Sequence, residues 1–249
     1  MAKKLLVIIS ILFLSGLGYQ AVKPNMSGAP PYGVTEDTVP EINFLNWLSQ
    51  WERPDGPAKI GLQVGHYKNN EFPEELEHLR GNSGANGGGK MEWEVNLEIA
   101  EKTAKILKTN GIEVDLIPAT VPPSYWADAF IAIHADGSSD KSKSGFKIAG
   151  PWRDLTGDTD KLIDYLTDSY YSQVGLDWDD NITANMRGYY AFSWWRHEHA
   201  IHPMTTAAIV ETGFLTNAND RKILLESPEL PAQAIADGII KYLQSEDLI

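Results

Sequence analysis

The sequence contains no cysteine, and this absence excludes several kinds of site. Disulfide bonds, iron–sulfur clusters and cysteine-based zinc sites all require thiol groups, so a metal ion here would have to be held by histidine, aspartate or glutamate. The absence does not reveal the compartment in which the protein works. The chain has only six histidines, so those that fall at chemically useful places in a fold carry weight.

Positive charge is also scarce. The 249 residues include 21 lysines and arginines against 34 aspartates and glutamates, which gives a formal net charge of −13. Binding to nucleic acid requires a basic face that neutralises phosphates, so we expect no nucleic-acid partner and no electrostatic attachment to anionic lipid. The hydrophobic fraction of 43% is typical of a globular protein, and the length allows one sizeable domain with an appendage.

The first 22 residues predict export. Lys3 and Lys4 precede an uncharged run, Leu5–Val22, which has the pattern of a signal sequence and lies at the lower edge of the length of a membrane span. We expect residues 1–22 to be a signal peptide or an N-terminal membrane anchor, rather than a buried core helix. The rest of the chain would then lie in the cell envelope or be secreted, and it would contact the membrane only through this segment.

Residues 23–57 form a linker by composition, because the segment contains six prolines. One short helix is predicted within it, over Glu41–Trp51. Trp47 and Trp51 would share a face of that helix. Packing against the main domain is the favoured role for these two rings, and stacking on a sugar is the alternative.

Residues 58–249 predict one catalytic domain of the α/β class. Short apolar runs alternate with helical periodicity, which favours a mixed, largely parallel twisted sheet flanked by helices. The segment Asp177–His202 has no clean period and is expected to form a loop-rich rim or short helices. The predicted strands are Lys59–Val64, Glu113–Ile117, Ala129–Ile133, Gly145–Ala149 and Thr205–Val210, and the predicted helices are Glu92–Asn110, Asp158–Val174 and Pro231–Gln244.

Ionisable side chains follow three of the predicted strands. His66 comes one glycine after the first strand, His134 comes directly after Ala129–Ile133, and Glu211 comes directly after Thr205–Val210. Glu92 opens the first long helix. Since ligands of open α/β sheets bind outside the carboxyl ends of the strands, we expect these groups to meet in one crevice.

Two neutral imidazoles and one carboxylate are a common catalytic zinc set, and a second carboxylate could then accept a proton. Each residue alone also has a structural reading. A histidine at a strand end is more often a hydrogen-bonded structural residue, and Glu92 could serve only the helix dipole. The convergence of all four at one edge favours the metal site.

A rival metal site is offered by His197-Glu198-His199-Ala200-Ile201-His202. The helical zinc motif requires histidines at positions i and i+4, but the residue four after His197 is Ile201. Pro203 would end any helix there. We therefore interpret this cluster as a solvated segment or a substrate rim.

The sequence resembles the zinc-dependent N-acetylmuramoyl-L-alanine amidases of the amidase-3 type, which cut bacterial peptidoglycan. The resemblance covers roughly Lys59 to Tyr242. The most specific of the stretches that carry it is the last. These stretches are Gly65-His66, Gly84-Ala85 with Glu92 through Leu97, Ala129 through Asp136, the Arg187-Gly188 pair, and Val210 through Asn217 with Asp220 following.

The resemblance implies one Zn²⁺ ion held by His66, Glu92 and His134. It makes Glu211 the general base that takes a proton from a zinc-bound water, and it implies peptidoglycan as the partner. Arg187, Asp136 and Asn217 are the residues that would contact substrate. The sequence departs from the family at Tyr67 and Lys68, where two glycines are usual, and Val121–Asp128 lacks the usual arginine.

Two other functions stay open at this level. The domain could be a non-catalytic wall-binding module that uses aromatic residues such as Tyr189, Tyr190, Trp194 and Trp195. It could also be a zinc peptidase that acts on stem peptides. The sequence does not reveal whether a protein activator exists or whether Asp177–His202 covers the site as a lid.

Overall fold

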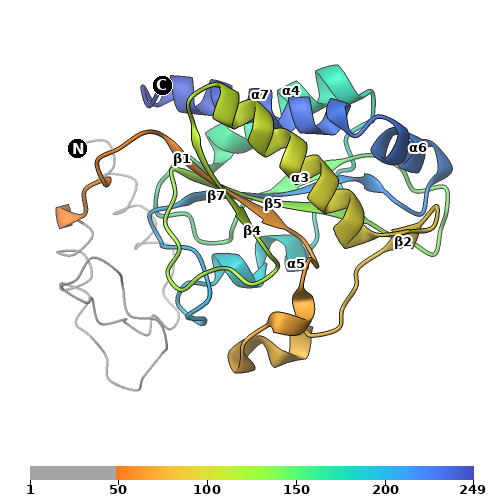
Figure 1. Ribbon diagram of the computed structural model, residues 1–249, viewed down its shortest axis with the longest axis horizontal. Helices are drawn as coiled ribbons and strands as arrows, with labels where there is room; N and C mark the ends of the chain where they lie inside the picture. Colours follow the sequence, from red (N-terminus) through yellow and green to blue (C-terminus); the bar gives the residue numbers. More distant parts are fainter. Residues whose placement is uncertain (1–48) are drawn as a thin grey trace.

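The computed structural model describes residues 49–249 (Figure 1). The signal or anchor segment over residues 1–22 and most of the predicted linker lie outside the described residues, as does the helix predicted over Glu41–Trp51 apart from its last three residues. Trp51 lies against the main domain, with its ring 6.3 Å from that of Trp126. No helix in the described range is long and apolar enough to cross a membrane.

The core of the fold is a five-stranded sheet in the order β4-β1-β5-β7-β6. The strands β4, β1, β5 and β7 run parallel, and the edge strand β6 runs antiparallel to β7. This arrangement confirms the predicted mixed, largely parallel sheet. The strands span Lys59–Val64 (β1), Glu113–Ile117 (β4), Ala129–Asp136 (β5), Lys147–Ala149 (β6) and Thr206–Phe214 (β7).

One face of the sheet is covered by long helices (Figure 1). Their apolar faces pack on alternate strand residues such as Ile60, Leu62 and Ile131, which are fully buried. Burial of such side chains stabilises each by about 1.5–3 kcal/mol. These helices are Glu92–Thr109 (α3), Thr159–Val174 (α4), Ala218–Glu226 (α6) and Glu229–Ser245 (α7).

The other face carries short, irregular elements instead (Figure 1). A second apolar cluster forms there, with Phe130 of β5 packed edge-on against Phe192 at a centroid distance of 6.4 Å. This face positions one wall of the site described below. Its elements are the 3-10 turns Asn69–Glu71 (η1), Glu74–Leu79 (η2) and Tyr190–Phe192 (η3), and the short helix Ala184–Arg187 (α5).

Two strands extend further than predicted. β5 continues to Asp136 and β7 to Phe214, so His134 and Glu211 lie inside strands rather than after them. The extension arises because β5 and β7 keep pairing past His134 and Glu211, and because Lys147 of β6 pairs with Glu211. The helix α6 and the small hairpin of β2 (Asn86–Gly87) and β3 (Lys90–Met91) were not predicted.

Candidate active site

Three predicted ligands converge at the carboxyl edge of the sheet. One ligand atom from each of His66, Glu92 and His134 lies within 4.8 Å of the others. Nε2 of His66 lies 3.4 Å from Oε1 of Glu92, and Nδ1 of His134 lies 3.0 Å from the same oxygen. Within the described part of the chain, this is the one group of three or more such side chains with the spacing of a metal site.

The neighbours of the two imidazoles fix which nitrogen faces the centre. His66 donates from Nδ1 to the backbone oxygen of Asn82 at 2.6 Å, which leaves Nε2 free for the centre. The Nε2 atom of His134 lies 3.4 Å from the hydroxyl of Tyr189, which leaves Nδ1 for the centre. Histidines that hold a metal are oriented in this way by a partner on the second nitrogen.

Glu92 is a buried carboxylate with several donors. It is the first residue of α3, so the helix N-terminus favours its negative charge. The backbone N–H of Ala85 donates to Oε2 at 2.7 Å, and the N–H of Ala135 donates to Oε1 at 3.2 Å. Burial opposes the charge, but the two histidines and the N–H of Ala85 outweigh it and lower the pKa of Glu92.

The two histidines have opposite tendencies. Burial lowers the pKa of His66, which favours the neutral ring that a metal requires. Burial also disfavours a charge on His134, but the carboxylates of Glu92 and Glu211 raise its pKa overall. The charges of the three groups therefore influence one another, and binding of a divalent cation would compete with protonation of the two rings.

Two glycines make room for this cluster. A Cβ atom at Gly65 would lie 2.5 Å from the ring of His134, and a Cβ atom at Gly84 would collide with the carboxylate of Glu92. Gly84 also has a φ of +70°, which side chains rarely tolerate. Both glycines fall in the stretches that carry the family resemblance.

Glu211 lies next to His134 in the ladder between β5 and β7. Its Oε2 atom is shielded from solvent and has no hydrogen-bond partner among the described residues. Burial, together with the nearby carboxylates of Glu92 and Asp136, raises the pKa of Glu211 to about 8, although His134 and Lys147 oppose this shift. A carboxyl group with a raised pKa beside a metal-ligand cluster is the environment expected for a group that moves protons.

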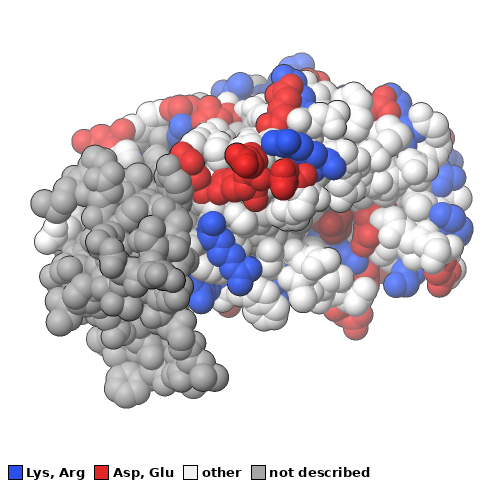
Figure 2. Space-filling model, turned by 90° about the horizontal axis from the view of Figure 1, so that it is seen from below, with Lys and Arg blue, Asp and Glu red and all other residues white. Residues whose placement is uncertain are grey.

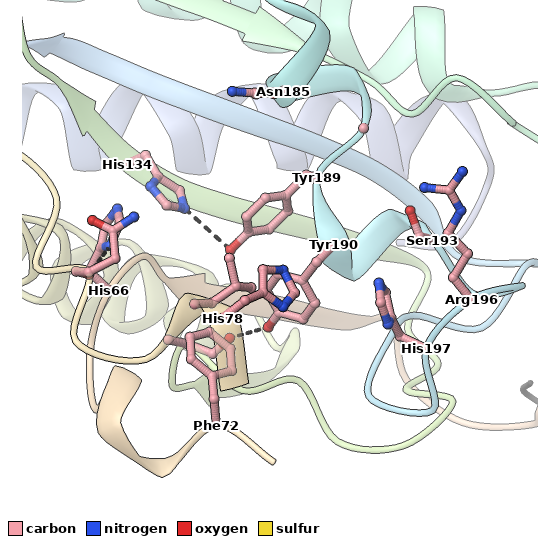
Figure 3. A pocket seen from close by; sticks show the side chains of 14 residues that line it. His66, Phe72, His78, His134, Asn185, Tyr189, Tyr190, Ser193, Arg196 and His197 are labelled. Carbon is pink, nitrogen blue, oxygen red and sulfur yellow. Dashed lines mark hydrogen bonds between the residues drawn. The ribbon is translucent and has the colours of Figure 1, made fainter. Parts of the chain in front are cut away.

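Two cavities meet at the group formed by His66, Glu92 and His134, which we call the ligand cluster. We call the first the carboxylate pocket; it measures about 590 Å³ and is lined by Glu92, Asp136, Lys141 and Glu211 among others. The second, the tyrosine pocket, measures about 480 Å³ and includes Tyr189, Tyr190, Phe72, Arg196 and His197. Figure 3 shows the tyrosine pocket, with His66 and His134 at one side of it. His66, Asn82 and His134 line both cavities, so the cluster is reached from two sides.

The three residues predicted to contact substrate lie in different settings. Asp136 lines the carboxylate pocket and forms an ion pair with Lys147 at 2.7 Å. Asn217 lines neither cavity; its side chain caps α6 by accepting from the N–H groups of Asn219 and Asp220. Arg187 also lies outside both pockets, with its guanidinium 5.2 Å from the ring centre of Trp152.

A buried chain of polar side chains next to His134 was not predicted. Tyr189 donates from its hydroxyl to Oε1 of Gln63 at 2.8 Å, and Gln63 donates from Nε2 to the backbone oxygen of Ala119 at 2.7 Å. Gln63 is fully buried in the middle of β1. An amide inside an otherwise apolar strand run was the available signal, but its partner lies 126 positions away.

The cluster at residues 197–202 forms no metal site in the structure. His199 donates its backbone N–H to Oε1 of Glu75 at 2.9 Å, and its Nδ1 lies 2.8 Å from the same oxygen. The N–H of Glu198 donates to Oε2 of Glu75 at 3.0 Å. These hydrogen bonds therefore join the segment Asp177–His202, which we call the rim segment, to η2.

The sequence matches the family described as N-acetylmuramoyl-L-alanine amidase (Amidase_3) over residues 60–241. Among curated proteins, N-acetylmuramoyl-L-alanine amidase LytC of Bacillus subtilis (strain 168) is 26% identical over 217 residues. The aligned region is 80% of this chain and 41% of LytC, so the chain spans less than half the length of that relative.

Solved structures show the same fold. N-acetylmuramoyl-L-alanine amidase AmiC2 of Nostoc punctiforme superposes with a TM-score of 0.52 at 22% identity, covering 77% of this chain and 99% of AmiC2. N-acetylmuramyl-L-alanine amidase Ami1 from Mycobacterium smegmatis gives a TM-score of 0.55 at 17% identity, covering 76% and 97% of the two chains.

Proposed function

Because the chain belongs to the N-acetylmuramoyl-L-alanine amidase family, we propose that it hydrolyses the amide bond between N-acetylmuramic acid and L-alanine in peptidoglycan, with one zinc ion as cofactor. The observation that carries this proposal is the convergence of His66, Glu92 and His134 beside Glu211 at one sheet edge. Peptidoglycan lies outside the cytoplasmic membrane, which agrees with the export predicted for residues 1–22.

The donor set fits zinc. It offers two imidazole nitrogens and one carboxylate, and each imidazole has a partner at its other nitrogen. His66, Glu92 and His134 would hold the ion. When bound, a zinc ion of this kind supplies a Lewis acid that acidifies water and polarises a carbonyl.

Glu211 is the group that would move the proton. It takes a proton from the attacking water and returns it to the amine of L-alanine as the amide bond breaks. To act as a base it must be ionised, but burial and the nearby carboxylates of Glu92 and Asp136 raise its pKa to about 8, which favours the protonated form near neutral pH. A cation held by His66, Glu92 and His134 would lower the pKa of Glu211, because its charge would favour the carboxylate form.

Lys147 supplies a positive charge at the carboxyl end of the parallel strands. Its ammonium group is buried and lies 2.7 Å from Asp136 and 2.9 Å from Asp179, and Lys147 pairs with Glu211 in the β6–β7 ladder. It thereby offsets the charge of Asp136 and keeps the carboxylate pocket from becoming a patch of unpaired acids.

The test is to incubate the full chain with purified peptidoglycan, with and without a zinc chelator, and to identify the products. New N-terminal L-alanine that disappears on chelation and returns with zinc is the expected result. Release of peptides with the muramic acid–alanine bond intact would indicate a peptidase instead. Zinc retention without any release would indicate a binding module.

A further inference from the structure

The tyrosine pocket extends away from the ligand cluster, and the proposed chemistry uses only its inner end. In Figure 3, His66 and His134 lie on one side of the pocket, and Ser193, Arg196 and His197 lie on the other, with Tyr189 and Tyr190 between them. Its volume of about 480 Å³ is within the range of ligand sites. A substrate group at the cluster would therefore continue into this space.

The charge of this pocket differs from that of the chain. No aspartate or glutamate is among its lining residues, although the chain has 34 acidic residues and a net charge of −13. The carboxylate pocket on the other side of the cluster is lined by Glu92, Asp136 and Glu211. Of the two cavities, the tyrosine pocket is the one suited to an anionic group.

Arg196 supplies the permanent charge. It is the single lysine or arginine that lines the tyrosine pocket, and within residues 49–249 it makes no ion pair. Its guanidinium lies 5.9 Å from the ring centre of Trp195. Burial lowers the pKa of the adjacent His197, so that ring would contribute hydrogen bonds rather than a second charge.

The segment that carries Arg196 is held in place. Glu75 of η2 accepts the backbone N–H groups of Glu198 and His199, so the two walls of the pocket are joined by one carboxylate. On the inner side, Tyr190 accepts from Nε2 of Gln63 at 3.0 Å. The backbone that carries Arg196 is therefore preformed, and only its exposed side chain has to be ordered when it binds an anion.

Resting on the proposed function, we propose that the tyrosine pocket binds the peptide stem of peptidoglycan and that Arg196 pairs with a free carboxylate of that stem. The glycan would then lie over the carboxylate pocket, whose exposed lining includes hydroxyl and amide groups. Stem peptides carry free carboxylates near the bond to be cut, whereas the sugar rings are uncharged. Arginine is the side chain best suited to a carboxylate because it can donate two parallel hydrogen bonds.

The test compares two ligands that differ in one charge: N-acetylmuramoyl-L-alanyl-D-glutamate and N-acetylmuramoyl-L-alanyl-D-isoglutamine, each with its γ-carboxyl group blocked as a methylamide. The only difference between them is then the α-carboxylate, which is an amide in the second ligand. Their dissociation constants are measured by calorimetry on the zinc-loaded full chain carrying Glu211→Gln, which prevents turnover. We expect the acid to bind roughly tenfold more tightly than the amide. Adding Arg196→Gln should remove that preference and leave the binding of the amide unchanged.

Arg153→Gln is the matched control. Arg153 lies 4.2 Å from the ring centre of the same Trp195 but does not line the pocket, so the preference for the acid should persist. Equal binding of acid and amide, a preference that survives Arg196→Gln, or absence of binding by both ligands would overturn the proposal. If Arg196→Gln weakened both ligands equally, the pocket would hold the glycan instead.

The calorimetric result can be separated from the result of the amidase assay. Calorimetry does not require cleavage, so a charge preference that depends on Arg196 in a chain that releases no L-alanine ends would preserve the pocket assignment and contradict the reaction. Cleavage of peptidoglycan without a charge preference would do the opposite.

Discussion

The two ends of the central strands handle buried charge in opposite ways. At the amino end of β5, Asp128 accepts two hydrogen bonds from Arg53, at 2.6 and 2.8 Å, and one from the N–H of Lys59 at 2.8 Å. At the carboxyl end, Oε2 of Glu211 is buried and has no partner among the described residues. Proteins seldom leave a buried carboxylate oxygen unpaired, so the contrast marks the carboxyl end as the place where a ligand completes the structure.

The balance of charge also differs between the two ends of the strands. The carboxylate of Asp128 is matched by one guanidinium. Around Glu211 there are the further carboxylates of Glu92 and Asp136, and the cations that face them are His134, when protonated, and Lys147. A divalent cation held by His66, Glu92 and His134 would remove this surplus of negative charge. Figure 2 shows one face of the molecule, on which acidic and basic side chains are separated by uncharged areas.

Removing a ligand should have the largest effect at the carboxyl end. We expect His134→Ala to lose zinc, measured by elemental analysis after dialysis, and to lose activity on peptidoglycan entirely, because two donors do not retain the ion. His199→Ala removes a histidine outside the cluster and should keep one zinc ion per chain. Undiminished zinc in His134→Ala would remove it from the ligand set.

Changing the proton-transfer group should have the next largest effect. Glu211→Gln preserves the shape of the side chain, so the protein should keep zinc while its rate falls by about 10²–10⁴-fold. The rate of release of L-alanine ends is the measurement, and Glu98→Gln, an exposed change on α3, is the control. Full activity in Glu211→Gln would show that another group accepts the proton.

The same variant should alter the pH dependence of stability in the metal-free protein. The pKa of Glu211 is about 8 in the fold against about 4.5 in the unfolded chain. The protonated carboxyl group therefore contributes fully to the free energy of unfolding below pH 4.5, and this contribution is lost as the pH rises to 8. Glutamine does not ionise. The measurement is the free energy of unfolding of the parent and of Glu211→Gln, determined with denaturant in the presence of chelator at pH 4 and at pH 9. Between these two pH values, we expect the stability of the variant relative to the parent to increase by roughly 2–5 kcal/mol.

A smaller effect should follow from Tyr189→Phe, which removes the hydroxyl beside Nε2 of His134 and leaves Gln63 without its donor. We expect about tenfold weaker zinc binding, in the range found when the partner of a metal-binding histidine is removed. Competition with a chromophoric chelator measures the zinc affinity. Tyr171→Phe, on an exposed ring of α4, should change nothing, and an unaltered zinc affinity in Tyr189→Phe would show that the hydroxyl does not orient His134.

The smallest effect on function should arise at the amino end. Asp128→Asn breaks the pair with Arg53, which is partly exposed, so we expect a loss of roughly 1–3 kcal/mol in the free energy of unfolding. Zinc content and turnover should match those of the parent at temperatures where both are folded. A fall in turnover without a fall in stability would mean that the two ends of the strands are coupled.

Local patterns predicted most of the sheet and placed His66, Glu92, His134 and Glu211 at one edge of it, whereas the family resemblance selected Glu92 as the carboxylate of the ligand cluster. The strands β1 and β4 have the predicted bounds, because their apolar runs end at turn signals. The cluster could be anticipated because the carboxyl ends of parallel strands meet at one edge, which places His66 and His134 together without any knowledge of distant contacts. The true ends of β5 and β7 depended instead on pairing with each other and with β6.

Other features depended on tertiary contacts or on weaker signals. The helix α6 has little amphipathic character, although the capping residue Asn217 and Asp220 in its first turn could have predicted it. The contact between Gln63 and Tyr189 joins β1 to the rim segment, and no local pattern encodes it. The acid-free lining of the tyrosine pocket likewise becomes visible only when η2 and the rim face each other.

The ligand cluster draws on three neighbouring parts of the fold. Glu92 opens α3 and His134 lies within β5, while His66 stands two residues beyond the end of β1, in the turn that follows it. The buried core and the donors around Glu92 hold α3 and β5 in place. An ion that binds this cluster in the folded chain and not in the unfolded one would stabilise the fold by mass action. Each tenfold excess of free ion over its dissociation constant would add about 1.4 kcal/mol, so metal supply would set the thermal stability of the protein as well as its loaded fraction.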